Sequence, residues 1–201
     1  MKKTDDLALK RRVLDADEMR RIIRRMAGEI VEHLKHFDET LLVGIRTRGL
    51  PLAERLVDEI HRMEGVRPPL GALDITFYRD DLSRIGPQPV VVGTDLAGNT
   101  IDGKVVILCD DVLYTGRTVR AALDELQDYG RPQAVRLAVL VDRGHRELPI
   151  QADVVGRSLQ TTDSELVEVG FTDTDGEDFV RLLERGAPPP AAERANDGDD
   201  A

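Results

Sequence analysis

Two adjacent acidic residues, Asp110 and Asp111, come directly after the apolar run KVVILC and before a segment of small and hydroxyl residues that opens a helical pattern. Carboxylates accept hydrogen bonds from hydroxyl groups, such as the vicinal hydroxyls of a sugar. Hydroxyl residues around Gly116 let backbone N–H groups approach an anion, and the start of a helix adds positive potential. The combination predicts a site for a sugar phosphate, and a ribose 5-phosphate fits both parts.

The same string, CDDVLYTGRT, has a simpler interpretation as a solvated turn with a helix cap. Two rival nucleotide sites lack their signatures, because the chain has no GxxxxGK followed by Ser or Thr and no GxGxxG after a strand. The choice between a sugar-phosphate site and a plain turn depends on where the fold places the acids.

The surrounding elements predict an α/β fold with a central, mostly parallel sheet flanked by helices. Continuous apolar runs at 41–45, 104–109 and 134–141 are typical of strands buried on both faces, and helical spacing recurs over 19–34, 51–63 and 119–129. Ligands bind at the carboxyl ends of strands in such sheets, which is where the two acids lie. We also expect a flexible excursion with a small hairpin over 80–103, and a terminal hairpin over 165–171 and 179–183.

Composition narrows the functional classes. The chain has 201 residues and a formal net charge of −10, so DNA is not an expected partner and RNA would need a local basic patch. The one cysteine, Cys109, fits a reducing cytoplasm, and no apolar run approaches the ~20 residues of a membrane span. We expect one domain over 15–185, a flexible extension over 1–14 and a disordered, acidic and Pro-rich tail over 186–201.

The string CDDVLYTGRT resembles the 5-phosphoribosyl-1-pyrophosphate (PRPP) motif of type I phosphoribosyltransferases. Together with VGIRTRGLPLA, LDITFYRDDL and LAVLVDRGHRELPI, in this order and spacing, it is similar to the PyrR family of pyrimidine-operon attenuators with uracil phosphoribosyltransferase activity. The resemblance covers about residues 17–185. It implies a type I phosphoribosyltransferase fold with a flexible loop and a small hood, conversion of uracil and PRPP to UMP and diphosphate, and Mg²⁺ bound with PRPP.

The resemblance also implies roles for individual residues. Asp110 and Asp111 would hold the ribose hydroxyls and are the candidate protein ligands of Mg²⁺, and Arg79, next to Tyr78 in the mobile loop, would act near the diphosphate. Whether Asp111 accepts a proton or only orients the sugar stays open. The remaining assignments are the PRPP and phosphate segment (Val112, Leu113, Tyr114, Thr115, Gly116, Arg117, Thr118), the diphosphate loop (Arg46, Thr47, Arg48, Gly49) and the uracil hood (Val141, Asp142, Arg143, Gly144, His145).

The family's second activity, nucleotide-dependent binding of the pyrimidine-operon messenger RNA, would use a basic patch. The alternative is a solvated helix face whose arginines pair with nearby glutamates. The chain also departs from the family at Gly28, Gln151 and Gln160–Asp163, where polar or basic character is lost. Two further alternatives are a sensor of PRPP or UMP with little catalysis and a transferase for another base. The family suggests a homodimer or larger assembly. The predicted RNA-binding residues are Arg20, Arg21, Arg24, Arg25, Arg146 and Arg157.

Other reactive side chains are expected to be structural. Cys109 is predicted to fill the core, and His33 and His36 are predicted to lie on the surface without a metal. His145 has two interpretations, a place near the ligand or a structural hydrogen bond.

Overall fold

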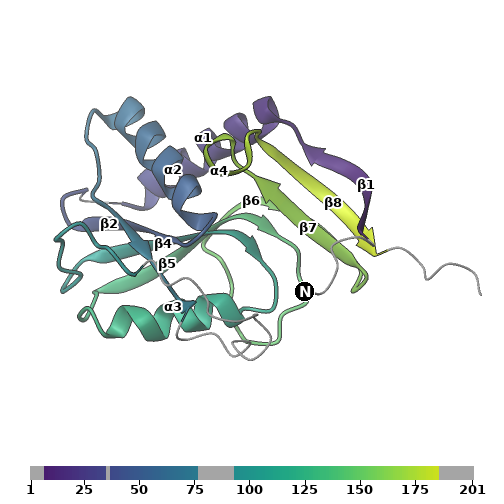
Figure 1. Cartoon of the computed structure of the whole chain (residues 1–201). Coiled ribbons are helices and arrows are strands. Elements are labelled where there is room, and N and C mark those ends of the chain that lie inside the picture. Colours follow the sequence, from purple (N-terminus) through teal and green to yellow (C-terminus); the bar gives the residue numbers. More distant parts are fainter. Residues whose placement is uncertain (1–6, 35–36, 77–92, 186–201) are drawn as a thin grey trace, which may run out of the picture.

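The chain is described by a computed structural model that covers residues 7–34, 37–76 and 93–185. A parallel sheet of five strands in the order β3-β2-β4-β5-β6 forms its centre (Figure 1). This confirms the predicted α/β fold with a parallel sheet. The strands are β2 (Thr40–Ile45), β3 (Leu70–Leu73), β4 (Val105–Leu113), β5 (Ala134–Asp142) and β6 (Val154–Ser158).

Helices cover both faces of this sheet. α1 (Ala16–His33) and α2 (Gly49–Glu64) lie on one face, and α3 (Arg117–Gln127) lies on the other (Figure 1). Successive strand residues point to opposite faces, so Leu42 and Ile107 pack in the core with α1 and α2, whereas Leu41 and Val106 pack in the core with α3. Burial on both faces is the physical reason for the continuous apolar strands.

A second, antiparallel sheet of order β1-β8-β7 lies beside the first (Figure 1). The terminal hairpin predicted over 165–171 and 179–183 is confirmed by β7 (Glu165–Gly170) and β8 (Phe179–Arg185), which are joined through the short helix α4 (Thr172–Asp175). The expectation of a flexible extension over 1–14 is corrected for its second half. β1 (Leu7–Leu14) pairs with β8 along its length, from Leu7 opposite Arg185 to Leu14 opposite Val180.

Local signals explain the element boundaries only in part. Asp15 caps α1, with its carboxylate accepting the Glu18 N–H and the Glu18 carboxylate accepting the Asp15 N–H. The loop predicted to begin at Asp110 instead starts later, because β4 pairs with β5 as far as Leu113 opposite Asp142. Both acids therefore lie within a strand, and α3 begins two residues earlier than predicted, at Arg117.

Several predictions fall outside the described residues: the first six residues of the extension, His36, the segment with Tyr78 and Arg79, the part of the predicted excursion before residue 93, and the tail over 186–201. Within the part of the chain that the structure describes, no helix is both long enough and apolar enough to span a bilayer.

Candidate active site

The turn after β2 lies against the strand that carries the acid pair. The turn contains a cis peptide bond between Arg46 and Thr47, and α2 begins at Gly49. A Cβ atom added at Gly49 would lie 2.3 Å from the Cys109 carbonyl oxygen and 3.2 Å from the Asp110 Cα. Only glycine permits this approach, because the neighbouring atoms belong to the backbone. The structure thus brings the predicted diphosphate loop and the predicted ribose site together at the carboxyl ends of β2 and β4.

The acid pair, Asp110 and Asp111, is partly shielded from solvent. Asp110 is buried and accepts the Asp111 N–H on its carboxylate at 3.0 Å, while Asp111 is half-buried. Burial raises the pKa of Asp111, against backbone hydrogen bonds and the positive charge of Arg48. Two carboxylates at the end of a parallel strand are acceptors suited to sugar hydroxyls, as the sequence predicted.

The predicted phosphate segment ends in an uncapped helix. Gly116 precedes α3 with a φ of 92° and, as a glycine, offers no side-chain cap, while the Arg117 N–H donates to the Thr115 hydroxyl at 3.4 Å. The first intrahelical acceptor is the Gly116 carbonyl, which takes the Arg120 N–H at 3.0 Å. The earlier N–H groups of the first turn have no acceptor within the helix. This arrangement suits the oxygen atoms of a phosphate.

A stacking contact and several hydrogen bonds join the predicted hood segment to its neighbours. The buried Arg143 guanidinium stacks on the Tyr114 ring at 4.0 Å and donates to the Thr161 hydroxyl and the Thr162 carbonyl, each at 3.1 Å. The Asp142 carboxylate accepts the Gly144 N–H at 3.0 Å. The stacking of Tyr114 on Arg143 connects the PRPP segment to the hood, and no pattern in the sequence indicated it.

His145 makes a structural hydrogen bond. Its Nε2 lies 2.6 Å from the Thr161 carbonyl oxygen, which can only accept, so Nε2 carries the proton. Its Nδ1 lies 3.2 Å from the Asp163 carboxylate, a contact that becomes an ion pair when the ring is protonated. The structure thus shows the structural hydrogen bond, while the ring also lies edge-on to Tyr114 at 5.8 Å. A place near the ligand stays a prediction.

The flanks of the segment that carries Tyr78 and Arg79 are joined by a buried carboxylate that sequence reasoning did not single out. Asp74 accepts the N–H groups of Thr76 and Gly93, each at 3.0 Å. The two ends of the segment 77–92 are therefore tied to one side chain at the edge of the sheet.

Two of the arginines predicted to bind RNA have internal partners. Arg25 donates to the Val155 and Gly156 carbonyls at 2.8 and 2.6 Å, which fastens α1 to β6. Arg146 donates to the Tyr114 carbonyl at 2.7 Å. Both guanidinium groups therefore have a structural role, and contact of these two residues with RNA stays a prediction.

The other four, Arg20, Arg21, Arg24 and Arg157, are exposed. Arg20 pairs with Asp17 at 2.9 Å on the same helix, which agrees with the alternative of a solvated helix face for this residue. Arg21, Arg25 and Arg157 line one surface depression of about 280 Å³, together with the acidic Glu18. The predicted basic patch thus reduces to residues of α1 and β6.

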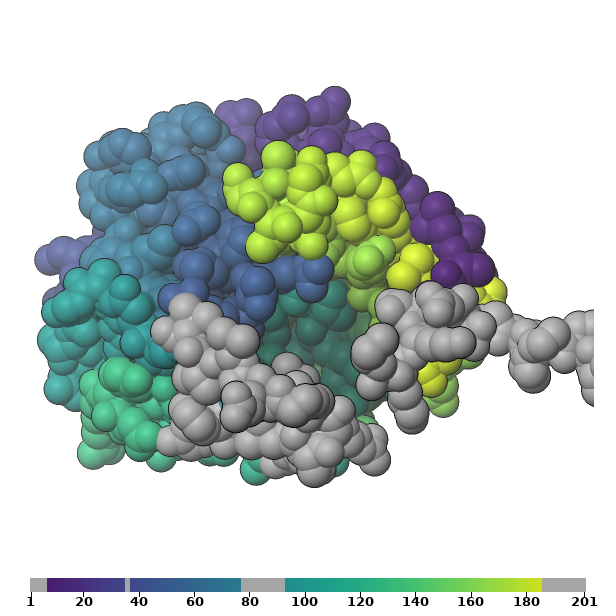
Figure 2. Space-filling view, in the orientation of Figure 1, coloured from purple at the N-terminus to yellow at the C-terminus, as the bar shows by residue number. Residues whose placement is uncertain are grey.

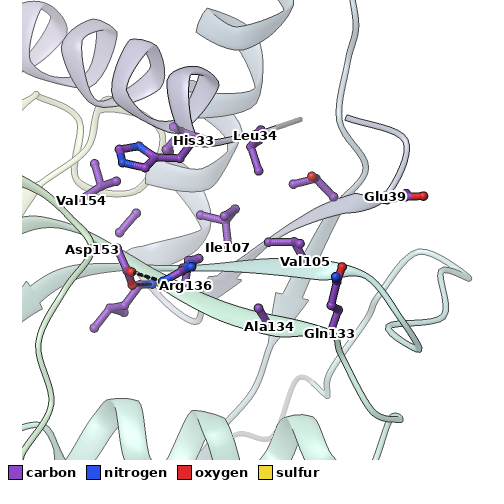
Figure 3. Close-up of a pocket in the computed structure, with 14 residues that line it drawn as sticks. His33, Leu34, Glu39, Val105, Ile107, Gln133, Ala134, Arg136, Asp153 and Val154 are labelled. Atoms are coloured by element: carbon purple, nitrogen blue, oxygen red, sulfur yellow. Dashed lines mark hydrogen bonds and ion pairs between the residues drawn. The ribbon is translucent and has the colours of Figure 1, made fainter. Parts of the chain in front are cut away.

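A larger cavity, of about 610 Å³, lies at the opposite, amino-terminal edge of the sheet (Figure 3). Its lining includes His33, Val105 and Ala134, and an ion pair of 2.9 Å joins Arg136 to Asp153 at its rim (Figure 3). His33 Nδ1 lies 2.7 Å from the Glu29 carbonyl oxygen. Among the described residues no group of three or more His, Cys, Asp or Glu side chains is placed to hold a metal ion. His36 lies outside the described residues.

Cys109 is fully buried, which confirms its place in the core, and burial raises the pKa of its thiol.

Comparisons with known proteins identify the family of this chain. A family model described as "Phosphoribosyl transferase domain" matches residues 11–174. The chain is 53% identical over 177 residues to a "Bifunctional protein PyrR" of Deinococcus radiodurans, covering 88% of this chain and 96% of that protein. It is 54% identical over 179 residues to the protein of the same name from Thermus thermophilus, covering 89% and 98%.

The fold also resembles solved structures of purine enzymes. A hypoxanthine phosphoribosyltransferase from Staphylococcus aureus superposes with a TM-score of 0.65 at 18% identity, covering 88% of this chain and 93% of that one. A hypoxanthine phosphoribosyltransferase of Trypanosoma cruzi superposes with a TM-score of 0.65 at 17% identity, covering 88% and 98%. These likenesses concern the fold, whereas the family model and the high identity to the curated relatives decide the family. The chain belongs to the phosphoribosyltransferase-domain family and, within it, to the PyrR proteins.

Proposed function

We propose that this protein transfers the 5-phosphoribosyl group of PRPP to uracil, forming UMP and diphosphate. The observation that carries the proposal is the contact between the turn at Gly49 and the strand end at Cys109–Asp110. It brings together a turn suited to a diphosphate and carboxylates suited to a ribose. The uncapped start of α3 completes the set with a place for the 5′-phosphate.

The chemistry explains why these groups belong together. Displacement of diphosphate from the anomeric carbon builds positive charge on the ribose and negative charge on the leaving group. Asp110 and Asp111 would stabilise the first and hold the ribose hydroxyls, and Arg48 would stabilise the second. Arg79 is proposed to add to the second charge. The segment 141–145 is proposed to hold uracil.

Mg²⁺ fits the donor set. Mg²⁺ is usually held by one or two carboxylates together with substrate phosphates, and the adjacent acids Asp110 and Asp111 offer such oxygens. When bound, the ion would neutralise charge on the diphosphate of PRPP. The cytoplasm and a homo-oligomeric state remain predictions.

The test is nucleotide formation by the purified protein with PRPP and Mg²⁺, using uracil, orotate, hypoxanthine and adenine in parallel. We expect UMP from uracil alone, and loss of product in the Asp110→Ala, Asp111→Ala double variant. Product from another base would assign a different substrate, and binding of PRPP or UMP without any product would indicate a sensor.

We also propose that the protein binds pyrimidine-operon RNA in a nucleotide-dependent way. The specific observation is a depression lined by three arginines and one glutamate, Arg21, Arg25, Arg157 and Glu18, on a chain of net charge −10. Arg21→Ala and Arg157→Ala should each weaken RNA binding. Each should also reduce the slope of log affinity against log salt concentration by about one. Arg131→Ala, an exposed arginine before β5, is the matched control. A salt-independent affinity would refute an interface that contacts phosphates.

A further inference from the structure

Two ion pairs join α4 and the residues after it to α2. Arg48 donates from Nη2 to Asp175 Oδ1 at 2.8 Å and from Nε to Asp175 Oδ2 at 3.3 Å. Arg55 donates from its two Nη atoms to both carboxylate oxygens of Asp178, at 2.6 and 2.8 Å. The two arginines lie about two helical turns apart. In Figure 2 the yellow-green atoms of this part of the chain lie against the blue atoms of the α2 region.

The two pairs have different surroundings. Arg55 lies within α2, where its guanidinium covers the Phe171 ring at 5.1 Å. Arg48 lies in the turn that contacts the acid-bearing strand, and its charge reaches Asp111, since the two side chains shift each other's pKa. The Arg55–Asp178 pair therefore joins α2 to the residues after α4. The Arg48–Asp175 pair makes the same kind of connection, and its arginine also lies beside the candidate site.

Asp175 is itself held in place. Its Oδ2 accepts the Phe171 N–H at 3.1 Å, at the start of α4. A carboxylate that is held in place and accepts from both Nε and Nη2 fixes the plane of the Arg48 guanidinium. The edge of the guanidinium that carries Nη1 is then left for another anion. Among the described residues no acceptor for the Arg48 Nη1 is recorded.

We propose that Asp175 is a positioning residue, which holds Arg48 so that its guanidinium faces the diphosphate of PRPP. The inference rests on the proposed transferase function. It assigns to the antiparallel sheet a part in binding the diphosphate, beyond closing the domain. Asp175 does not touch the substrate and acts through Arg48 alone.

The test compares Asp175→Asn with Asp178→Asn, which are the same chemical change in the two neighbouring pairs. With Mg²⁺ and uracil, Asp175→Asn should raise the KM for PRPP about tenfold, the loss expected for one charge-assisted interaction. The KM for uracil should stay within about twofold. Asp178→Asn should lower the unfolding temperature and leave the KM for PRPP within about twofold. Asp175→Glu, which keeps the carboxylate, should recover part of the affinity.

Three results would overturn the inference: equal changes in the KM for PRPP in both Asn variants, a parallel rise in both KM values in Asp175→Asn, or a fall in the KM for PRPP. The last would mean that Asp175 competes with the diphosphate for Arg48. If the wild-type protein forms no UMP, the proposed function fails instead. The inference is then tested by calorimetric binding of diphosphate with Mg²⁺, which Asp175→Asn should weaken and Asp178→Asn should not.

Discussion

The two sheets of this protein are stabilised in different ways. The parallel sheet is covered on both faces, and residues such as Leu42 and Leu108 are fully buried. The antiparallel sheet joins the two ends of the described chain, buries mainly one face and carries ion pairs such as Lys10 with Glu165, at 2.8 Å. Apolar packing surrounds the strand that carries the acid pair, and Val167, Val169 and Val180 of the second sheet belong to the same apolar core. Ion pairs such as Arg48 with Asp175 are added at the connection between β7 and β8. Changes in packing next to the acids should therefore act on the site, whereas changes in packing within the second sheet should act mainly on stability.

The largest effect is expected from Gly49→Ala. The new Cβ would meet the Cys109 carbonyl oxygen, which is backbone and cannot yield, so the turn must move away from the acids. We expect UMP formation to fall more than ~100-fold, as misplacement by about 1 Å can cause. Steady-state assays with circular dichroism as a check of folding measure this.

Gly28→Ala is the control for Gly49→Ala. It also replaces a helical glycine, but no atom lies within 4 Å of its added Cβ. It should keep full activity and gain ~0.5–1 kcal/mol of stability from helix propensity. Activity within a few-fold of wild type in Gly49→Ala would show that this close approach is not needed.

Asp111→Asn should separate activity from stability. Because burial raises the pKa of Asp111, its charged form costs folding free energy at neutral pH. The variant should lose UMP formation by about 100-fold, since the ribose loses a charged partner. Its unfolding free energy at pH 7 should rise by ~1 kcal/mol, as charge removal at functional sites often gives. Denaturant unfolding checks the gain, and a loss of stability would contradict it.

Gly170→Ala tests packing in the second sheet. Gly170 pairs with Phe179, and an added Cβ would lie 2.2 Å from the Phe179 ring. Overpacking of this kind should destabilise the protein by ~1–3 kcal/mol. The kcat should change by less than about threefold well below the unfolding temperature. A loss of activity as large as that of Gly49→Ala would show that this sheet shapes the acid site directly.

The smallest effect concerns pH. Burial alone would raise the pKa of Asp178, but hydrogen bonds from Arg55 and from the Thr172 N–H and hydroxyl lower it from 3.8 to about 2. A carboxyl with a lower pKa in the folded state stabilises the fold above its unfolded pKa and loses that contribution as the pH falls through the folded pKa. Urea midpoints should therefore decline between pH 3.8 and about 2, more in the wild type than in Asp178→Asn. Parallel curves would show that this pair adds nothing to acid stability.

Much of the site could be predicted from sequence because its residues are local. The acid pair, Gly116 and Thr118 lie within one short string, and the helix that follows is amphipathic. The resemblance to the PyrR family assigned the turn at Gly49 to the same site, and the structure gives the reason that glycine is needed there.

The sequence by itself determined the central sheet, because continuous apolar runs can be buried only between two covered faces. It placed the acids just after a strand, whereas pairing with β5 extends β4 through them to Leu113. Tertiary structure alone decided that β1 pairs with β8, that Arg25 and Arg146 serve the fold, and that Asp175 holds Arg48. Each of these depends on groups that are far apart in the chain. The sequence around an arginine does not show whether its side chain is paired or free in solvent. That is decided only when the fold brings a carbonyl or a carboxylate within hydrogen-bond distance.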